Sequence, residues 1–394
     1  MSNNHENLDE KVEDCRRKLL ECPSSRLDSR CQLLNNLSAA LYNRFGQLGG
    51  IDYLEESITC RRQGLNLCPI GNPYHPYFLN DLANAVSTHF DQSGRMEDLE
   101  EAITYHRQAL VLRPHGHPNR SMSLNNLAAV VSTRFDQLGR MEDLEEAITC
   151  NRQALALFPH GHPDRSSSLN NLATALSTCF NQLGRMEDLE EAITFHRQAL
   201  ALLPHGHPDR SSSLNNLAYA VSTRFHQLGR MEDLEAAITC HRQALGLRPH
   251  GHPGRSMSLT NLANAMSTRF EQSRSHDDLL DAVKYLSEAK NILPTGHPCQ
   301  LTIEFSLASI FLIECDIASK LDESLQALHM MTKAFELFEH AADHPPASYK
   351  NRFVAAVIWA RNAHRRKHPS AVHAYTKSLT LLGRRLTLAP TIES

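Results

Sequence analysis

Residues Gly184 to Ala218 read "GRMEDLEEAITFHRQALALLPHGHPDRSSSLNNLA", and this stretch returns along the chain with a period of 45 residues. Its first block, GRMEDLE, begins at Gly94, Gly139, Gly184 and Gly229. Its last block, LNNLA or a variant of it, begins at Leu34, Leu79, Leu124, Leu169, Leu214 and Leu259. Six units therefore share one register from about residue 26 to 296, and a degenerate seventh follows from His297. A fixed period of this length predicts a repeat architecture.

The apolar pattern of one unit predicts two helices. The first has apolar residues at the spacing of one helical face, namely Leu169, Leu172, Ala173, Leu176 and Phe180. We expect Asp164 or a following serine to cap its start through a side chain, and Gly184 to end it in the left-handed conformation. The second helix runs from about Glu187 to Leu203 and carries the stripe Leu189, Ala192, Ile193, Ala199, Leu200 and Leu203. Pro204 stops it, because proline cannot continue the hydrogen-bond ladder.

No segment alternates apolar and polar residues as a strand does, so the chain is predicted to be all-α. One amphipathic helix pair cannot bury its own apolar face, and stacking neighbouring pairs buries a continuous core. We expect residues 1–25 to form a capping helix or partial repeat, residues 26–343 to form seven tandem units, and residues 344–394 to form a last helix pair and a tail.

The unit resembles a known family. The spacing of Ala192, Ala199 and Pro204 is similar to the second helix of a tetratricopeptide repeat, and LNNLA resembles its first helix. The long period and the "HPDRSSSLNNLA" entry resemble the kinesin-light-chain type of this repeat. The whole consensus resembles still more the repeat arms of fungal proteins that carry a caspase-like CHAT domain. The resemblance implies a right-handed α-solenoid with a concave groove lined by the first helix of each pair.

Short polar side chains recur on the face of the first helix that the resemblance places in this groove. The candidate peptide-binding residues are Asn35, Asn36, Asn80, Asn84, Asn125, Asn126, Asn170, Asn171, Thr174, Asn215, Asn216, Tyr219, Asn261 and Asn264. An amide offers both a donor and an acceptor, so a ladder of amides suits the backbone of an extended peptide. The alternative is that these asparagines only cap turns or bridge neighbouring helices. The groove is expected to lack the lysines and arginines that clamp a terminal carboxylate.

Two sets of recurrent residues allow a structural and a functional interpretation. The loop "PHGHP" has the His-x-His spacing of metal sites, but stacked helices lie about 8–10 Å apart, too far for loops of neighbouring units to share one zinc. We therefore expect turns and no metal site. His106, His196 and His241 occupy a packed slot of the second helix, either as a hydrogen-bonded polar layer or as a pH-sensitive one. The row Arg120, Arg165, Arg210 and Arg255 is expected to be solvated or weakly paired.

Composition excludes several classes of function. The net charge of −4 and pI near 6.6 give no basic footprint for nucleic acid. The N-terminus lacks a secretion signal, and no apolar run is long enough to span a bilayer. The ten scattered cysteines are expected to be reduced. These features favour a cytoplasmic protein without membrane contact. No phosphate loop, nucleophile elbow or zinc-protease motif occurs. A cysteine–histidine pair stays open, because such residues meet in space rather than in sequence.

These patterns predict a non-catalytic scaffold, without cofactor, that binds a protein or an extended peptide in the groove. The first alternative is the regulatory recognition arm of a caspase-like peptidase whose catalytic domain is absent from this chain. The second is a passive structural scaffold. The patterns predict neither the identity of the partner nor the oligomeric state.

Overall fold

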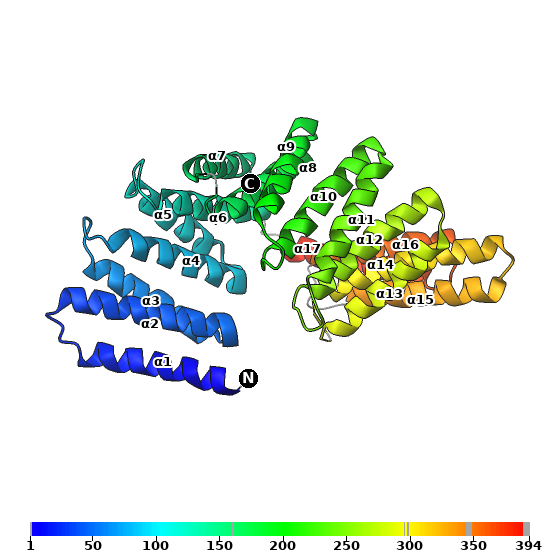
Figure 1. Cartoon of the computed structure of the whole chain (residues 1–394). Coiled ribbons are helices and arrows are strands. Elements are labelled where there is room, and N and C mark those ends of the chain that lie inside the picture. Colours follow the sequence, from blue (N-terminus) through cyan, green and yellow to red (C-terminus); the bar gives the residue numbers. More distant parts are fainter. Residues whose placement is uncertain (1, 160, 295, 298, 344–348, 389–394) are drawn as a thin grey trace, which may run out of the picture. The chain divides into compact units, whose positions relative to one another are not determined.

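The computed structural model describes residues 2–159, 161–294, 296–297, 299–343 and 349–388, and in these residues it contains helices and no strand (Figure 1). In chain order the helices are α1 (Ser2–Glu21), α2 (Leu27–Leu48), α3 (Ile51–Leu67), α4 (His75–Ser93), α5 (Met96–Val111), α6 (Arg120–Leu138), α7 (Met141–Leu157), α8 (Arg165–Leu183), α9 (Met186–Leu202), α10 (Arg210–Leu228), α11 (Met231–Gly246), α12 (Arg255–Ser273), α13 (His276–Ile292), α14 (Gln300–Lys320), α15 (Ser324–Asp343), α16 (Tyr349–Arg365) and α17 (Ala371–Leu388). The all-α prediction is confirmed. The expected boundary at residue 344 lies outside the described residues.

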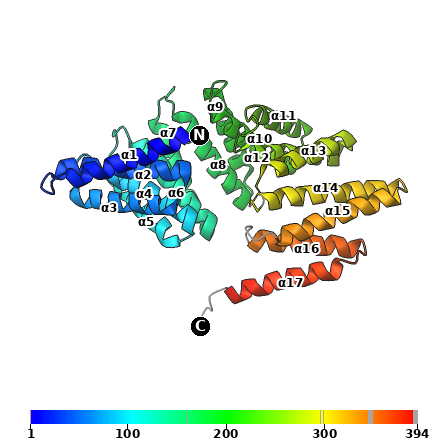
Figure 2. The same ribbon diagram turned by 90° about the horizontal axis from the view of Figure 1, so that it is seen from below.

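The chain divides into two compact units, Met1–Leu202 and Leu203–Ser394. In the N-terminal unit α1 packs on α2, and the pairs α2/α3, α4/α5, α6/α7 and α8/α9 follow. In the C-terminal unit the pairs are α10/α11, α12/α13, α14/α15 and α16/α17 (Figures 1 and 2). We call the first member of each pair helix A and the second helix B.

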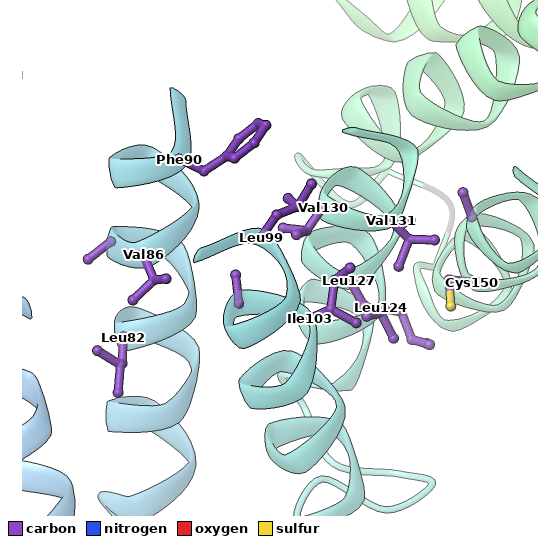
Figure 3. Close-up of a cluster of buried hydrophobic side chains, with 14 of the residues drawn as sticks. Leu82, Val86, Phe90, Leu99, Ile103, Leu124, Leu127, Val130, Val131 and Cys150 are labelled. Atoms are coloured by element: carbon purple, nitrogen blue, oxygen red, sulfur yellow. The ribbon is translucent and has the colours of Figure 1, made fainter. Parts of the chain in front are cut away.

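Alanines and leucines from consecutive pairs build each core. Figure 3 shows one such cluster in the N-terminal unit, where Leu82 of α4, Leu99 and Ile103 of α5, and Leu127 of α6 meet. The alanine that recurs in helix B is fully buried in successive units, at Ala102, Ala147, Ala192, Ala237 and Ala282. A side chain this small lets neighbouring helix axes approach closely. Burial of this stripe is what the amphipathic pattern of helix B predicted.

The ends of helix A confirm one expectation and correct another. Gly184 ends α8 in the left-handed conformation, with φ of 69°. The residue at the other end, Asp164, makes no side-chain cap, so the predicted capping by this aspartate is wrong. Instead its backbone N–H donates to Nδ1 of His162 at 3.2 Å, and its carbonyl accepts the N–H of Ser168. The ring nitrogen of His162 thus accepts a main-chain proton within the turn that leads into α8.

The same histidine contact recurs in every described copy of the loop. The Nδ1 atoms of His117, His207, His252 and His297 accept the N–H two residues further on, at 3.0–3.2 Å. Among the described residues, no group of three or more His, Cys, Asp or Glu side chains is placed to hold a metal ion. The second histidine of the loop is therefore a turn-forming residue, as the structural interpretation predicted.

The arginine that opens helix A is a capping residue and not a solvated one. Arg120 donates to the carbonyls of Arg113 and Leu110, at 2.6 and 3.3 Å, where α5 ends. Arg165 donates in the same way to Phe158 and Leu155 at the end of α7. The expectation of a solvated or weakly paired row is wrong, because the last carbonyls of a helix lack intrahelical donors and a cation suits the helix C-terminus.

A second arginine, near the end of helix A, joins neighbouring pairs. Arg134 of α6 holds Asp143 of α7 with two hydrogen bonds of 3.0 and 2.6 Å, and its third nitrogen reaches Glu100 of α5 at 2.7 Å. In the C-terminal unit Arg269 of α12 makes the same contacts with Asp278 and Glu235. We call this arrangement the inter-pair arginine bridge.

Candidate binding groove on the helix A face

The recurrent asparagines of helix A form two rows with different surroundings. The first row, Asn35, Asn80, Asn125, Asn170 and Asn215, is half-buried or buried. The second row begins one residue later, at Asn36, Asn126, Asn171, Asn216 and Asn261, and ranges from half-buried to exposed. Because neighbouring residues on a helix point about 100° apart, only the second row faces outward.

First-row amides bond to side chains of neighbouring helices. The amide nitrogen of Asn125 donates to Ser168 of the next pair at 2.7 Å, and that of Asn215 donates to Ser258 at 3.1 Å. Asn170 and Asn215 also bond through Oδ1 to His196 and His241 of their own helix B, at 3.0 and 2.9 Å. These contacts are the bridging role that the sequence left open as an alternative to peptide binding.

The second row and its neighbours one turn later are the more accessible amides. Asn36, Asn171, Asn216, Asn264, Thr174 and Tyr219 are exposed, and Asn84, Asn126 and Asn261 are half-buried. Asn126 donates to Oδ1 of Asn80 at 3.0 Å, which links α6 to α4. The hydroxyls of Thr88, Thr133, Thr178, Thr223 and Thr268 bond to carbonyls of their own helices. The groups of this face that can still bond to a ligand are therefore mainly the asparagine amides.

Two hollows lie along this face in the N-terminal unit. The N-terminal hollow, about 390 Å³, is formed by α2, α3, α4 and α6, and candidates Asn84 and Asn126 line it. The second hollow, about 190 Å³, is formed by α6, α7 and α8, and candidates Asn171 and Thr174 line it. The structure thus brings predicted residues of α4 and α6 together in the N-terminal hollow, whereas those of the second hollow both come from α8.

The N-terminal hollow also contains a cation that the sequence prediction excluded. Arg61 of α3 lines it, only 5% exposed, with Nη1 donating to Ser57 Oγ at 2.7 Å and its guanidinium 5.0 Å from the ring centre of Tyr42. Burial lowers the pKa of Arg61, while Asp81 across the hollow and Tyr42 act in the opposite direction. The expectation of a groove without lysine or arginine is therefore wrong. Arg61 occupies the position of helix B that holds histidine in other pairs. Side chains at this position lie beneath the asparagine rows.

The histidines in this slot are buried and neutral. His106, His196 and His241 are at most 4% exposed, and burial lowers the pKa of each to about 4. The charge of Arg113 lowers the pKa of His106 further. His196 and His241 bond to first-row asparagines, so they form the hydrogen-bonded layer that the sequence allowed. The two nitrogens of His106 find no partner among the described residues, because Asn80, the equivalent amide, bonds to Asn126.

Three buried cysteines, Cys60, Cys150 and Cys179, do not have the environment of nucleophiles. All ten cysteines of the chain are free thiols. Burial raises the pKa of Cys60 and of Cys150 to about 11, and it also raises the pKa of Cys179. A thiol attacks as the thiolate, so these buried side chains are protonated near neutral pH. None of the described helices combines the length and apolarity needed to cross a bilayer.

The paired helices of this chain are similar to tetratricopeptide repeats of known proteins. The family model described as a tetratricopeptide repeat matches residues 165–209 and 210–254. Human IFIT1, in a structure described as a dimer with PPP-AAAA, is similar at 14% identity with a TM-score of 0.54, covering 97% of this chain and 78% of that chain. The apo quorum sensor NprR from B. thuringiensis is similar at 12% identity with a TM-score of 0.50, covering 86% and 83%.

A putative kinesin light chain of Podospora anserina, with nearly identical TPR-like repeats, is similar at 22% identity with a TM-score of 0.40, covering 56% of this chain and 96% of that chain. No curated protein matches the sequence. Identities this low show the fold alone.

Proposed function

We propose that this chain of tetratricopeptide repeats binds an extended peptide segment of a partner protein on the helix A face, without catalysis by the chain itself. The observation that carries the proposal is the pair of hollows on the helix A face, one lined by Asn126 and the other by Asn171 of the second row. Tetratricopeptide-repeat scaffolds generally mediate protein interactions, and the buried thiols of this chain do not favour a covalent mechanism.

The spacing of the second row suits an extended chain. Packed helices lie about 8–10 Å apart, and an extended peptide advances about 3.3 Å per residue. Within the N-terminal unit, the side chain at the second-row position of each helix A therefore meets roughly every third residue of the ligand. Because Asn36 and Asn171 are exposed and each amide has a donor and an acceptor, they suit both the N–H and the C=O of a main chain. Such contacts depend little on the sequence of the peptide.

Arg61 and Asp81 add a preference at the N-terminal hollow. They present one positive and one negative group to the same space. A ligand that places an acidic side chain beside Arg61 stabilises a guanidinium that burial disfavours. We propose a peptide rather than a nucleic acid, because this hollow offers a single arginine beside a carboxylate and the chain carries a net charge of −4.

The test starts from a displayed library of random peptides selected on the full chain. The affinity of a selected peptide is then measured for the variant Asn126→Ala/Asn171→Ala/Asn216→Ala, with Asn66→Ala/Asn181→Ala as a control for exposed asparagines outside the second row. We expect unchanged helicity and an affinity at least ~10-fold weaker for the groove variant, since each lost hydrogen bond costs about 0.5–1.5 kcal/mol. An unchanged affinity refutes groove binding.

Two other outcomes separate the alternative functions. A library that returns no peptide, together with tight binding of a labelled single-stranded RNA, replaces the peptide with a nucleic acid. If the library returns no peptide and RNA does not bind either, the chain is a passive scaffold. A regulatory arm of a caspase-like peptidase would use the same face, so its mark is a change in the activity of an added peptidase when the selected peptide is present.

A further inference from the structure

A larger hollow lies in the C-terminal unit, away from the helix A face. It measures about 1160 Å³ and opens between α13, α14 and α15. Its walls combine apolar and charged side chains, and the apolar part includes Leu280, Val283, Phe311, Ile317, Leu321 and Met330. Leu280 is 53% exposed and Leu321 is 65% exposed, so apolar surface faces solvent here.

In three other pairs the corresponding place holds the arginine of the inter-pair arginine bridge, at Arg134, Arg224 and Arg269, whereas His89 and Cys179 stand there in α4 and α8. Arg134 lies there between Asp143, the third residue of α7, and Glu100 of the preceding helix B. Arg134 is only 8% exposed and Asp143 only 3%, so the bridge packs tightly between three helices. The arginine both occupies the volume and ties one pair to the next.

At the α13/α14/α15 junction all three positions of the bridge differ. Four periods of 45 residues after Arg134 and Glu100 come Glu314 and Leu280. The third residue of α15, in the place of Asp143, is Gln326. All three line the hollow. The arginine is thus replaced by a carboxylate and its two acidic partners by Leu280 and Gln326, while Glu323, four periods after Asp143, also lines the hollow.

Glu314 has no direct partner in its new setting. Within the described residues it makes no hydrogen bond or ion pair, it is half-buried, and the charges that act on it are those of His276 and Lys333. Burial raises its pKa, and the charges of His276 and Lys333 offset this only in part. Lys333 lies over the ring of Phe311 at 5.6 Å. The carboxylate therefore faces a hollow of mixed lining, with no cation in hydrogen-bonding contact.

We propose that this hollow docks an amphipathic helix of a partner protein, which packs its apolar face on Leu280, Ile317 and Leu321 and sets a single lysine or arginine against Glu314. The incoming base takes over the role that the repeat's own arginine has in other pairs. Arg274, Lys320 and Lys333 also line the hollow and repel a generally basic partner, so acidic residues flank the base. Apolar helices in grooves are a recurrent mode of recognition.

Three fluorescent peptides test the proposal. Each is a ~16-residue helix with a leucine face and glutamate flanks, long enough to gain helicity on docking. They differ only at the centre of the apolar face, which carries lysine, leucine or glutamate. Anisotropy titration of the full chain is expected to give the tightest binding for lysine, about tenfold tighter than for glutamate, as for a close charge pair. Equal dissociation constants for the three peptides, or no binding of any, overturn the proposal.

Variants of the chain locate the site. Glu314→Arg, which restores the residue type of Arg134, is expected to invert the order, so that the glutamate peptide binds best. Leu280→Glu/Glu314→Arg rebuilds two members of the bridge and is expected to raise the melting temperature and weaken all three peptides more than tenfold. An unchanged order in Glu314→Arg contradicts the site even if the peptides bind. The groove variant Asn126→Ala/Asn171→Ala/Asn216→Ala is expected to bind all three peptides normally, so this test is independent of the proposed function.

Discussion

The buried histidine layer predicts that mild acid destabilises the chain. His106, His196 and His241 have a pKa of about 4 in the folded chain against 6.5 for a free side chain. Above pH 6.5 the histidines are neutral in both states, and their full contribution to stability is present. As the pH falls from 6.5 towards 4, the unfolded chain binds protons that the folded chain does not, so stability is lost. Below about pH 4 the loss from these groups levels off.

The size of the effect follows from the pKa shift. One pKa unit corresponds to about 1.4 kcal/mol, so each histidine costs about 1.4 kcal/mol of stability at pH 5.5 and the three together cost about 4 kcal/mol. The cause is desolvation, because a charged imidazole would lie in a dry layer beside first-row asparagines. His106 is expected to contribute the largest share, since Arg113 adds repulsion.

The chain supplies its own control, because Asn151 occupies the same slot of α7 without a titrating group. Urea unfolding of the wild type and of His106→Asn/His196→Asn/His241→Asn is followed by circular dichroism at pH 7.5 and 5.5. The wild type is expected to lose roughly 4 kcal/mol more than the variant over this range. Equal losses in the two proteins would refute the reasoning, because acid sensitivity would then come from surface groups.

Three further predictions concern the repeat itself. Arg134→Ala is expected to destabilise the chain by roughly 3–5 kcal/mol in urea unfolding, because it leaves the buried carboxylate of Asp143 unpaired. A loss below ~1 kcal/mol is typical of a surface ion pair and would contradict the inter-pair arginine bridge. A Cβ added at Gly64 would lie 2.3 Å from the Phe78 ring, so Gly64→Ala is expected to cost about 1–3 kcal/mol. Gly64→Ala/Phe78→Ser, which restores the alanine and serine of other pairs, is expected to recover part of it, and no recovery speaks against this complementarity. Calorimetric titration with zinc is expected to show no saturable binding, and a defined stoichiometry would refute the assignment of the PHGHP loops as turns.

The helices and the glycine that ends helix A followed from the sequence, since each depends on local signals, but the capping at the start of helix A did not. Leu172 and Leu176 lie one turn apart on an apolar face, and Gly184 tolerates the positive φ that ends α8. The contacts of Arg165 did not follow in the same way. Its partners Leu155 and Phe158 belong to the preceding helix, and nothing in the residue types shows that an arginine reaches back to them.

The two asparagine rows show why the groove was only partly predictable. Asn125 and Asn126 are identical in type and adjacent, yet one bonds to Ser168 of the next pair and the other faces a hollow. The rotation of the helix decides between them, and a one-residue ambiguity in that rotation exchanges their roles. The groove prediction missed Arg61 because this position of helix B was assigned to the core. The Arg61 side chain instead lines the N-terminal hollow.

The C-terminal hollow could not be predicted from the repeat pattern, because the seventh unit contains an insertion. One period of 45 residues after His276 falls at Leu321, but α15 begins later, at Ser324. This shift puts Gln326 in the position of Asp143. The degenerate sequence of the seventh unit therefore carries a structural difference that a fixed period cannot reveal.

The position of the bound peptide tests the central claim most directly. A photoreactive amino acid is placed at position 171, in the second row of α8, or at position 181, an exposed asparagine near the end of the same helix that does not line the second hollow. After illumination with the library-selected peptide, mass spectrometry is expected to find the crosslink at 171 and none at 181. Crosslinking at 181 alone, or equally at both positions, would contradict peptide binding on the helix A face.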